Sequence, residues 1–319
     1  MTIGVLFVNL GTPAAPTPEA VRDFLREFLS DPRVVELPRF IWYLILYGII
    51  LPFRSRRSAK LYNKIWTPEG SPLRVITFQQ AEKLQRHLGD KIKVVVGMRY
   101  GCPCLKAALL KFEKLHINKI LILPAYPQYS SPSTGTVFDK VNEILRLSRV
   151  YPEIRTVRDY HNDAGYIQAV ANTLKDNKSQ KILFSFHGLP QKFIDKGDVY
   201  LEQCQETVNK IVGVLKLPKD QFAISFQSRL GKQPWLKPYT DLLLMQWGQE
   251  GVESVSVVCP GFSADCLETL EEVNMQNREI FLSAGGKVFN YIPALNDSDE
   301  HIAVLAQLIE KNIQGWEND

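Results

Sequence analysis

Short apolar runs rich in β-branched residues alternate with longer segments of helical periodicity along most of this chain. The runs that we interpret as strands are Ile3–Leu10, Ile92–Gly97, Lys119–Ala125, Lys181–Phe186, Phe222–Phe226, Ser254–Cys259 and Lys287–Ile292. Nearly continuous apolar strands separated by helices are typical of parallel sheets that helices cover on both faces. The two sets of strands therefore predict two doubly wound, Rossmann-like α/β lobes rather than one barrel.

The length of the chain also favours two lobes, because 319 residues is about twice the usual size of a single domain. We place an N-terminal lobe at residues 1–157 and a C-terminal lobe at residues 158–299, with the boundary near Arg155–Asp163. The final helix, within residues 300–319, is expected to pack on the N-terminal lobe. The main helical patterns are Pro18–Leu29, Thr77–Leu88, Lys106–His116, Gly165–Asn177, Asp198–Leu215 and His301–Gln314.

Charge and cysteine content exclude several classes of protein. The formal net charge is only +4 and no long run of like charges appears, so nucleic acid is not an expected partner. The five cysteines show no CxxC spacing and no secretory signal precedes Ile3, which predicts a reducing, cytoplasmic location. Cys102 and Cys104 flank Pro103. They are either a thiol clip for a metal ion or two ordinary reduced cysteines, and the short, stiff spacing favours the second interpretation.

One segment is unusually apolar. Residues 40–53 read FIWYLILYGIILPF and are followed by Arg54, Arg56 and Arg57. The run is shorter than the roughly 20 residues that a helix needs to cross a bilayer. It is either a buried core helix or a surface lip that touches a membrane or an apolar substrate, with arginines at headgroup level. In the second case, residues 40–57 would bring the protein peripherally to the inner face of the membrane.

Ligands of open α/β sheets bind beyond the carboxyl ends of the strands, so the residues that follow each strand make up the candidate site. These segments are Asn9–Pro13, Met98–Gly101, Pro124–Ser130, Ser185–Pro190, Gln227–Gly231 with Trp235, and Cys259–Asp265. They are rich in aromatic and small residues. None carries a GxGxxG, GxxxxGK[ST] or GxSxG motif, so nucleotide binding and serine-nucleophile hydrolysis lose their main support.

His187 is the one histidine that we place at the carboxyl end of a predicted strand. A lone histidine is most often structural. Here it closes an apolar strand, Gly188 and Pro190 follow it, and carboxylates from another strand end can meet it. These features favour a role in the site.

Those carboxylates follow the strand that ends at Cys259. Ser263 can act as an N-cap, which predicts a helix from about Ala264. Asp265, Glu268 and Glu272 would then lie above one another on one helix face. Such a row suits the passage of a cation or the removal of protons, although a solvated helix face would show the same pattern.

A neutral imidazole with one carboxylate suits a ferrous ion that must be held and then released. The same pair suits proton abstraction. We therefore predict a labile metal site in an aromatic cleft. His187 and Glu268 are its catalytic and metal-binding candidates, and Glu272 is a further candidate ligand.

These residues resemble the ferrochelatase family. The segment Leu183–Pro190, continuing through Gly197 and Asp198 to Tyr200, is similar to the family signature, with its histidine at His187. Cys259–Glu272 resembles the acidic helix of the family, with the essential glutamate at Glu268.

Further blocks match the family in the expected order, so the resemblance covers essentially the whole chain. They are Asn9–Pro13, Met98–Tyr100, Tyr126–Ser130, Gln227–Arg229 and Trp235–Pro238. The Gly70–Leu73 segment is most similar to proteobacterial members that act on protoporphyrin.

The resemblance implies a porphyrin clamped between two Rossmann-like lobes. It also implies insertion of Fe²⁺ into protoporphyrin IX to give protohaem, the last step of haem biosynthesis, without ATP or a resident cofactor. His187 and Glu268 would flank the centre of the macrocycle, one or both binding iron or taking pyrrole protons. The residues that would shape the porphyrin pocket are Arg99, Tyr100, Tyr129, Trp235 and Phe262.

The chain departs from the family in two places. Some members carry a [2Fe–2S] cluster on cysteines near the C-terminus and one in the Tyr-Ser block. Here no cysteine follows Cys266 and Ser131 takes the block position, so no such cluster is expected. Gln276 stands where the acidic row would have a third glutamate. The alternatives that we keep are a cobalt chelatase of tetrapyrrole synthesis and a non-catalytic porphyrin or haem carrier.

Overall fold

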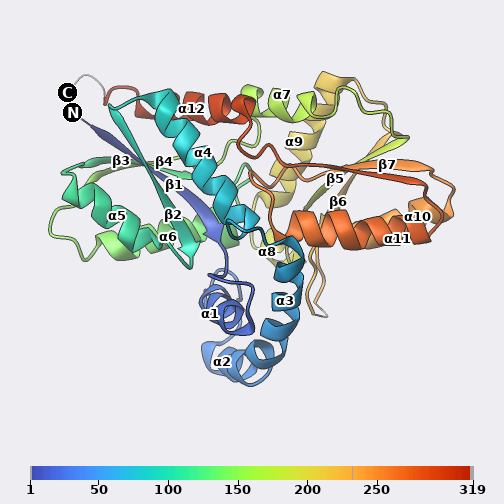
Figure 1. The fold of residues 1–319 in the computed structure, drawn as a ribbon, viewed down its shortest axis with the longest axis horizontal. Coiled ribbons are helices and arrows are strands. Elements are labelled where there is room, and N and C mark those ends of the chain that lie inside the picture. Colours follow the sequence, from blue (N-terminus) through green and yellow to red (C-terminus); the bar gives the residue numbers. More distant parts are fainter. Residues whose placement is uncertain (1, 232, 317–319) are drawn as a thin grey trace. The chain divides into compact units, whose positions relative to one another are not determined.

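The structure, a computed structural model, describes residues 2–231 and 233–316. Its strands are β1 (Ile3–Gly11), β2 (Ile92–Tyr100), β3 (Lys119–Pro124), β4 (Glu153–Thr156), β5 (Lys181–His187), β6 (Phe222–Gln227), β7 (Ser254–Val258) and β8 (Val288–Ile292). Within the described residues they form two four-stranded parallel sheets, in the orders β2-β1-β3-β4 and β6-β5-β7-β8 (Figure 1). The predicted fold class, α/β with two Rossmann-like parallel sheets, is confirmed.

The helices fill the intervals between these strands. They are α1 (Pro18–Leu29), α2 (Arg39–Ile45), α3 (Leu51–Ile65), α4 (Pro72–Leu88), α5 (Leu105–Lys114), α6 (Thr136–Leu145), α7 (Ala164–Asn172), α8 (Gln191–Asp195), α9 (Tyr200–Leu215), α10 (Thr240–Gln249), α11 (Arg278–Ser283) and α12 (Asp299–Ile313). The π-helical segments are η1 (Leu46–Ile50), η2 (Ser131–Gly135) and η3 (Glu268–Asn277). Helix α1 has the predicted bounds because the Thr17 hydroxyl caps it and Pro18 occupies its first turn.

The chain divides into two compact units. Unit 1 runs from the N-terminus to Tyr126, continues with Ser130–Asp159, and takes up the chain again from Asp297. Unit 2 comprises Pro127–Tyr129 and Tyr160–Asn296. Unit 1 is therefore discontinuous in sequence, and its last part includes α12.

In unit 1, helices α4 and α12 lie on one face of the sheet and α5 and α6 on the other (Figure 1). The central strand β1 is almost wholly buried. The edge strand β4, which the sequence did not predict, is short and half-exposed. Arg155 on β4 donates to the carbonyls of Asn312 and Gln314, at 2.9 and 2.8 Å, and so ties the end of α12 to the sheet edge.

In unit 2, α7 and α9 cover one face of the sheet, and α10 and α11 cover the other (Figure 1). Strand β5 lies between β6 and β7, and the parallel register sets His187 beside Gln227. Because the strands are parallel, the residues that follow β5, β6 and β7 meet at one edge of the sheet.

The apolar segment of residues 40–53, which we call the apolar lip, forms α2, η1 and the start of α3. Large side chains on it are exposed: Phe40 by 77%, Leu44 by 63% and Phe53 by 74%. Trp42 and Leu46 are buried beneath them. The interpretation of a buried core helix is therefore wrong, and the segment presents an apolar surface. None of the helices in the described residues combines the length and apolar character needed to cross a bilayer.

Candidate functional site

His187 is the last residue of β5, and its side chain is partly exposed. Its Nδ1 lies 2.7 Å from the carbonyl oxygen of Gly188. Because a carbonyl only accepts hydrogen bonds, Nδ1 carries the proton in the neutral ring, and Nε2 presents a free lone pair. The Tyr200 hydroxyl donates to the His187 carbonyl at 3.0 Å and fixes the strand end. The backbone thus orients this imidazole to accept a proton or a metal ion through Nε2.

Glu272, on η3, contacts the residue that follows β6. The backbone N–H of Ser228 donates to Glu272 Oε1 at 2.7 Å, and the Ser228 hydroxyl donates to Oε2. Ser228 has φ +64°, a left-handed conformation that is uncommon for a residue with a side chain. The Glu272 carboxylate holds this turn through both hydrogen bonds.

The charges of His187 and Glu268 both act on the carboxyl group of Glu272. Burial raises the pKa of Glu272, the Ser228 hydrogen bonds and the charge of His187 act against that shift, and the charge of Glu268 adds to it. The turn of a π-helix is wider than that of an α-helix, so residues four apart, such as Glu268 and Glu272, stay on one face. All three residues belong to unit 2, and their common role in the site stays a prediction.

Asp265 does not belong to this row. The chain is irregular through Cys266 and becomes helical at Leu267, so the predicted helix start at Ala264 is wrong. Asp265 is 6% exposed and accepts hydrogen bonds from the Tyr291 hydroxyl and, at 2.8 Å, from Asn296 Nδ2. These long-range hydrogen bonds hold Asp265 in the irregular segment before the helix. The residue anchors the loop before η3.

The other predicted residues of unit 2 surround the strand ends. The Trp235 ring packs against Gly188, next to His187, and its indole N–H donates to the Leu230 carbonyl at 2.8 Å. The backbone N–H of Tyr129 donates to Gln203 Oε1 at 2.7 Å. Phe262 is half-buried and packs against the hydrophobic core of the unit.

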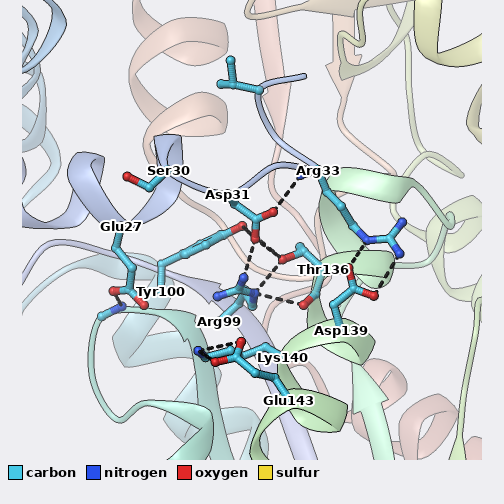
Figure 2. A network of polar contacts seen from close by, with 12 residues as sticks. Glu27, Ser30, Asp31, Arg33, Arg99, Tyr100, Thr136, Asp139, Lys140 and Glu143 are labelled. Atoms are coloured by element: carbon cyan, nitrogen blue, oxygen red, sulfur yellow. Dashed lines mark hydrogen bonds and ion pairs between the residues drawn. The ribbon is translucent and has the colours of Figure 1, made fainter. Parts of the chain in front are cut away.

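Arg99 and Tyr100 lie in unit 1, in a buried polar network around Asp31 (Figure 2). The Arg99 guanidinium and the Thr136 hydroxyl donate to Asp31 Oδ2, and the Tyr100 hydroxyl donates to the same oxygen at 3.0 Å. Arg99 Nε also donates to the Thr136 carbonyl at 3.0 Å, and the guanidinium carbon lies 4.3 Å from the centre of the Tyr100 ring.

Tyr100 has no exposed surface, and burial raises its pKa, so it remains a hydrogen-bond donor. Asp31 is 7% exposed, and 10% of the Arg99 side chain is accessible. A direct contact of Arg99 or Tyr100 with a ligand stays a prediction.

The sequence did not single out Ser228, Tyr200 or Asp31 as site residues. Ser228 lies in the Gln227–Gly231 segment that follows a predicted strand, so its position was a usable signal. Tyr200 also had a signal, because it ends the segment that resembles the family signature. Asp31 had none, because it lies in the loop after α1. No group of three or more His, Cys, Asp or Glu side chains in the described part of the chain is arranged to hold a metal ion.

Comparison with known proteins identifies the family of the chain. The model of the family described as Ferrochelatase matches residues 2–313. The chain belongs to the ferrochelatase family. The predicted family is thereby confirmed over almost the whole chain.

Curated ferrochelatases from proteobacteria are close relatives. The ferrochelatase of Thioalkalivibrio sulfidiphilus is 50% identical over 323 residues, which cover 98% of this chain and 88% of that protein. Those of Nitrosococcus oceani and Proteus mirabilis are each 48% identical, covering 98% and 96% of this chain and 88% and 96% of the relatives.

Among solved structures, SirB from Bacillus subtilis with Fe³⁺ matches 100% of this chain and 98% of its own, with TM-score 0.58 and 10% identity. The sirohydrochlorin chelatase SirB from Bacillus subtilis subspecies spizizenii in complex with cobalt gives the same coverage and TM-score at 9% identity. At this level of identity the likeness shows a shared fold between this ferrochelatase family member and those chelatases.

Proposed function

We propose that this protein is an ATP-independent ferrochelatase that inserts Fe²⁺ into protoporphyrin IX to give protohaem, the last step of haem biosynthesis. Sequence identity of 48–50% to curated ferrochelatases, over nearly the whole chain, supports this reaction. We assign its centre to His187 and Glu268, with Glu272 beside them. The observations that support this assignment are the place of His187 at the end of β5, the shared face of Glu268 and Glu272 on η3, and the action of both His187 and Glu268 on the pKa of Glu272.

The reaction requires bases. A free-base porphyrin carries two pyrrole N–H protons, and both leave as Fe²⁺ enters, so metal insertion yields the metalloporphyrin and two protons. His187 Nε2 offers a neutral lone pair for a proton or for the incoming metal. A carboxyl group with a raised pKa, as burial gives Glu272, retains a proton more readily than an ordinary glutamate. Nitrogen and oxygen donors also suit a ferrous ion that must be released again.

The test is an anaerobic assay with protoporphyrin IX and Fe²⁺, without ATP, followed by metalloporphyrin absorbance. His187→Ala and Glu268→Gln should each lower turnover by about 100-fold or more, because positioned acid–base groups contribute that much. His87→Ala and Glu279→Gln, which remove the same functional groups from exposed helix positions, should leave turnover unchanged.

Three results would contradict the proposal. Near-normal turnover in either centre variant would remove His187 or Glu268 from the centre. Tight porphyrin binding without turnover in the parent protein would favour the carrier, and turnover with Co²⁺ but not Fe²⁺ would favour the cobalt chelatase. The relatives give no support to these alternatives.

We assign the porphyrin contacts to Tyr129, Trp235 and Phe262, and a supporting role within unit 1 to Arg99 and to Tyr100, which has no exposed surface. Aromatic faces bind a flat apolar macrocycle through their large contact area. Trp235→Ala should weaken porphyrin binding, measured by porphyrin fluorescence. Trp66→Ala, a loss of the same ring at the end of α3, is the matched control.

The apolar lip is assigned to a membrane surface. Arg56, Arg57 and Lys60 are exposed on α3 directly after the exposed Phe53. An apolar surface bordered by cations binds a lipid interface that contains anionic headgroups. The enzyme would then act from the cytoplasm at the inner face of the membrane.

Sedimentation with vesicles that contain anionic lipid tests this assignment. Replacing Phe40, Leu44 and Phe53 by serine should release the protein, because these side chains are exposed and carry little of the core. Leu147→Ser, at a position that is 78% exposed in unit 1 outside the lip, should not. Unchanged sedimentation of the triple variant would contradict the assignment.

A further inference from the structure

The turn after β2 carries two exposed thiols that the proposed reaction does not use. Cys102 and Cys104 are exposed, whereas Cys204, Cys259 and Cys266 are buried. Cysteine is among the residue types most often found in protein interiors, so two exposed thiols that flank one residue are unusual.

Both sides of this turn are held in place. The Gly101 N–H donates to the Glu27 carboxylate of α1 at 2.8 Å, and the Met98 N–H donates to the Pro103 carbonyl at 2.7 Å. Cys104 also pairs with Met98 as an isolated bridge and directly precedes α5. Its thiol makes no capping hydrogen bond to the helix. The backbone is thus fixed, and the thiols are left without a structural task.

The Cys-Pro-Cys spacing is too short and stiff for a zinc clip with several ligands, but two sulfur atoms this close in sequence can share one two-coordinate ion. Residues two apart have Cα atoms no more than about 7 Å from each other. Cysteines at Cα separations of roughly 4.4–6.8 Å can even be joined directly by a disulfide, and metal–sulfur bonds of about 2.3 Å extend the reach further. Because the turn is already ordered, binding an ion costs little additional chain entropy.

The number of ligands available at this turn determines which metal ion fits. Zn²⁺ in structural sites takes four ligands, whereas the described residues supply no third His, Cys, Asp or Glu that would complete a cluster with this pair. Thiolates are soft ligands that favour Cu(I). We propose that Cys102 and Cys104 form a two-thiolate site for a soft monovalent cation, Cu(I), within unit 1. Binding converts two thiols and Cu⁺ into a bis-thiolate complex and two protons, with no change of oxidation state.

This site would separate soft from borderline metal ions. The pair lies in unit 1, whereas His187 and Glu268, with nitrogen and oxygen donors, lie in unit 2. Burial raises the pKa of the Cys204, Cys259 and Cys266 thiols well above the usual range, so they stay protonated and do not compete. Copper would therefore occupy the surface thiols without entering the proposed iron-insertion centre.

The experiment is an anaerobic titration of the reduced full-length protein with Cu(I) held by a coloured bicinchoninate complex. Loss of colour should report one Cu(I) per chain. Cys102→Ser and Cys104→Ser should each weaken the affinity by at least tenfold, because each removes one of two ligands, and the double variant should take up none at the same chelator concentration. Cys266→Ala, which removes a buried thiol, should bind as the parent does. Zn²⁺ should not compete.

Iron insertion by the metal-free double variant should equal that of the parent, which separates this proposal from the proposed function. Uptake of Cu(I) by the double variant, or single variants that bind as tightly as the parent, would overturn the two-thiolate site. A thiol reagent should modify two thiols in the folded protein and five after unfolding. Fewer than two in the folded, reduced protein would also overturn it.

Discussion

Replacing Asp31 by alanine should destabilise unit 1 strongly. The substitution leaves the Arg99 guanidinium, only 10% of whose side chain is exposed, without its carboxylate partner. It also leaves the hydroxyls of Tyr100 and Thr136 without their acceptor. Deleting one partner of a buried ion pair costs about 3–5 kcal/mol, and each orphaned buried hydroxyl costs about 1–3 kcal/mol before relaxation.

We expect a loss of about 4 kcal/mol for Asp31→Ala, because the surrounding side chains recover part of these contacts. For a unit of this size, that loss corresponds to a melting temperature lower by roughly 8–16 °C. Differential scanning calorimetry measures it. Tyr100→Phe, which removes one hydrogen bond and leaves the ion pair in place, should cost only about 1 kcal/mol.

A double-mutant cycle distinguishes the proposed cause. Asp31→Ala combined with Arg99→Met removes both charges, so the double variant should be more stable than Asp31→Ala alone. Two results would refute the reasoning: a cost below about 1 kcal/mol for Asp31→Ala, or a double variant whose cost equals the sum of the single costs.

Three further predictions follow from local geometry. Burial raises the pKa of Glu272, so protonation of this carboxyl stabilises the fold fully below its ordinary pKa of 4.5, and this stabilisation is lost as pH rises through the raised pKa. In urea unfolding, Glu272→Gln should therefore gain stability relative to the parent as pH rises through that window. A difference in stability that does not change with pH would contradict this prediction. Gly188→Ala should lower stability by about 1–3 kcal/mol and impair turnover, because the added Cβ would lie 2.7 Å from the Gln227 carbonyl oxygen. By contrast, Gly213→Ala should raise stability by about 0.5–1 kcal/mol, because the added Cβ would meet open space on α9. Trp316→Ala should cost about 3–5 kcal/mol in thermal unfolding, because this side chain is 2% exposed and stacks 4.2 Å from the Arg155 guanidinium.

The sheets were predictable because their strands are buried on both faces. A run such as Ile120–Ala125 contains only apolar residues, and a parallel strand covered by helices requires that composition. Strand β4 escaped prediction because it is an edge strand of mixed composition, and its pairing with β3 alone defines it. Hydropathy indicated that residues 40–53 are apolar but gave no information about which side chains face solvent.

The site was predictable where a residue follows a buried strand, as His187 does. The conformation around Asp265 was not, because the competing hydrogen bonds come from Tyr291 and Asn296, which lie far along the chain. The π-helical form of η3 likewise depends on packing. Glu268 and Glu272 share a face in both an α-helix and a π-helix, so their pairing did not depend on which form the sequence adopts.

The discontinuity of unit 1 has a consequence for biosynthesis. The ribosome releases residues 160–296 before α12 emerges, so the whole of unit 2 leaves the exit tunnel while unit 1 still lacks its last helix. Helix α12 buries Ile302, Leu305 and Ile309 in unit 1. Until α12 emerges, the nascent chain must carry the apolar surface that these side chains later cover. The unit that is synthesised first is thus the last to be completed.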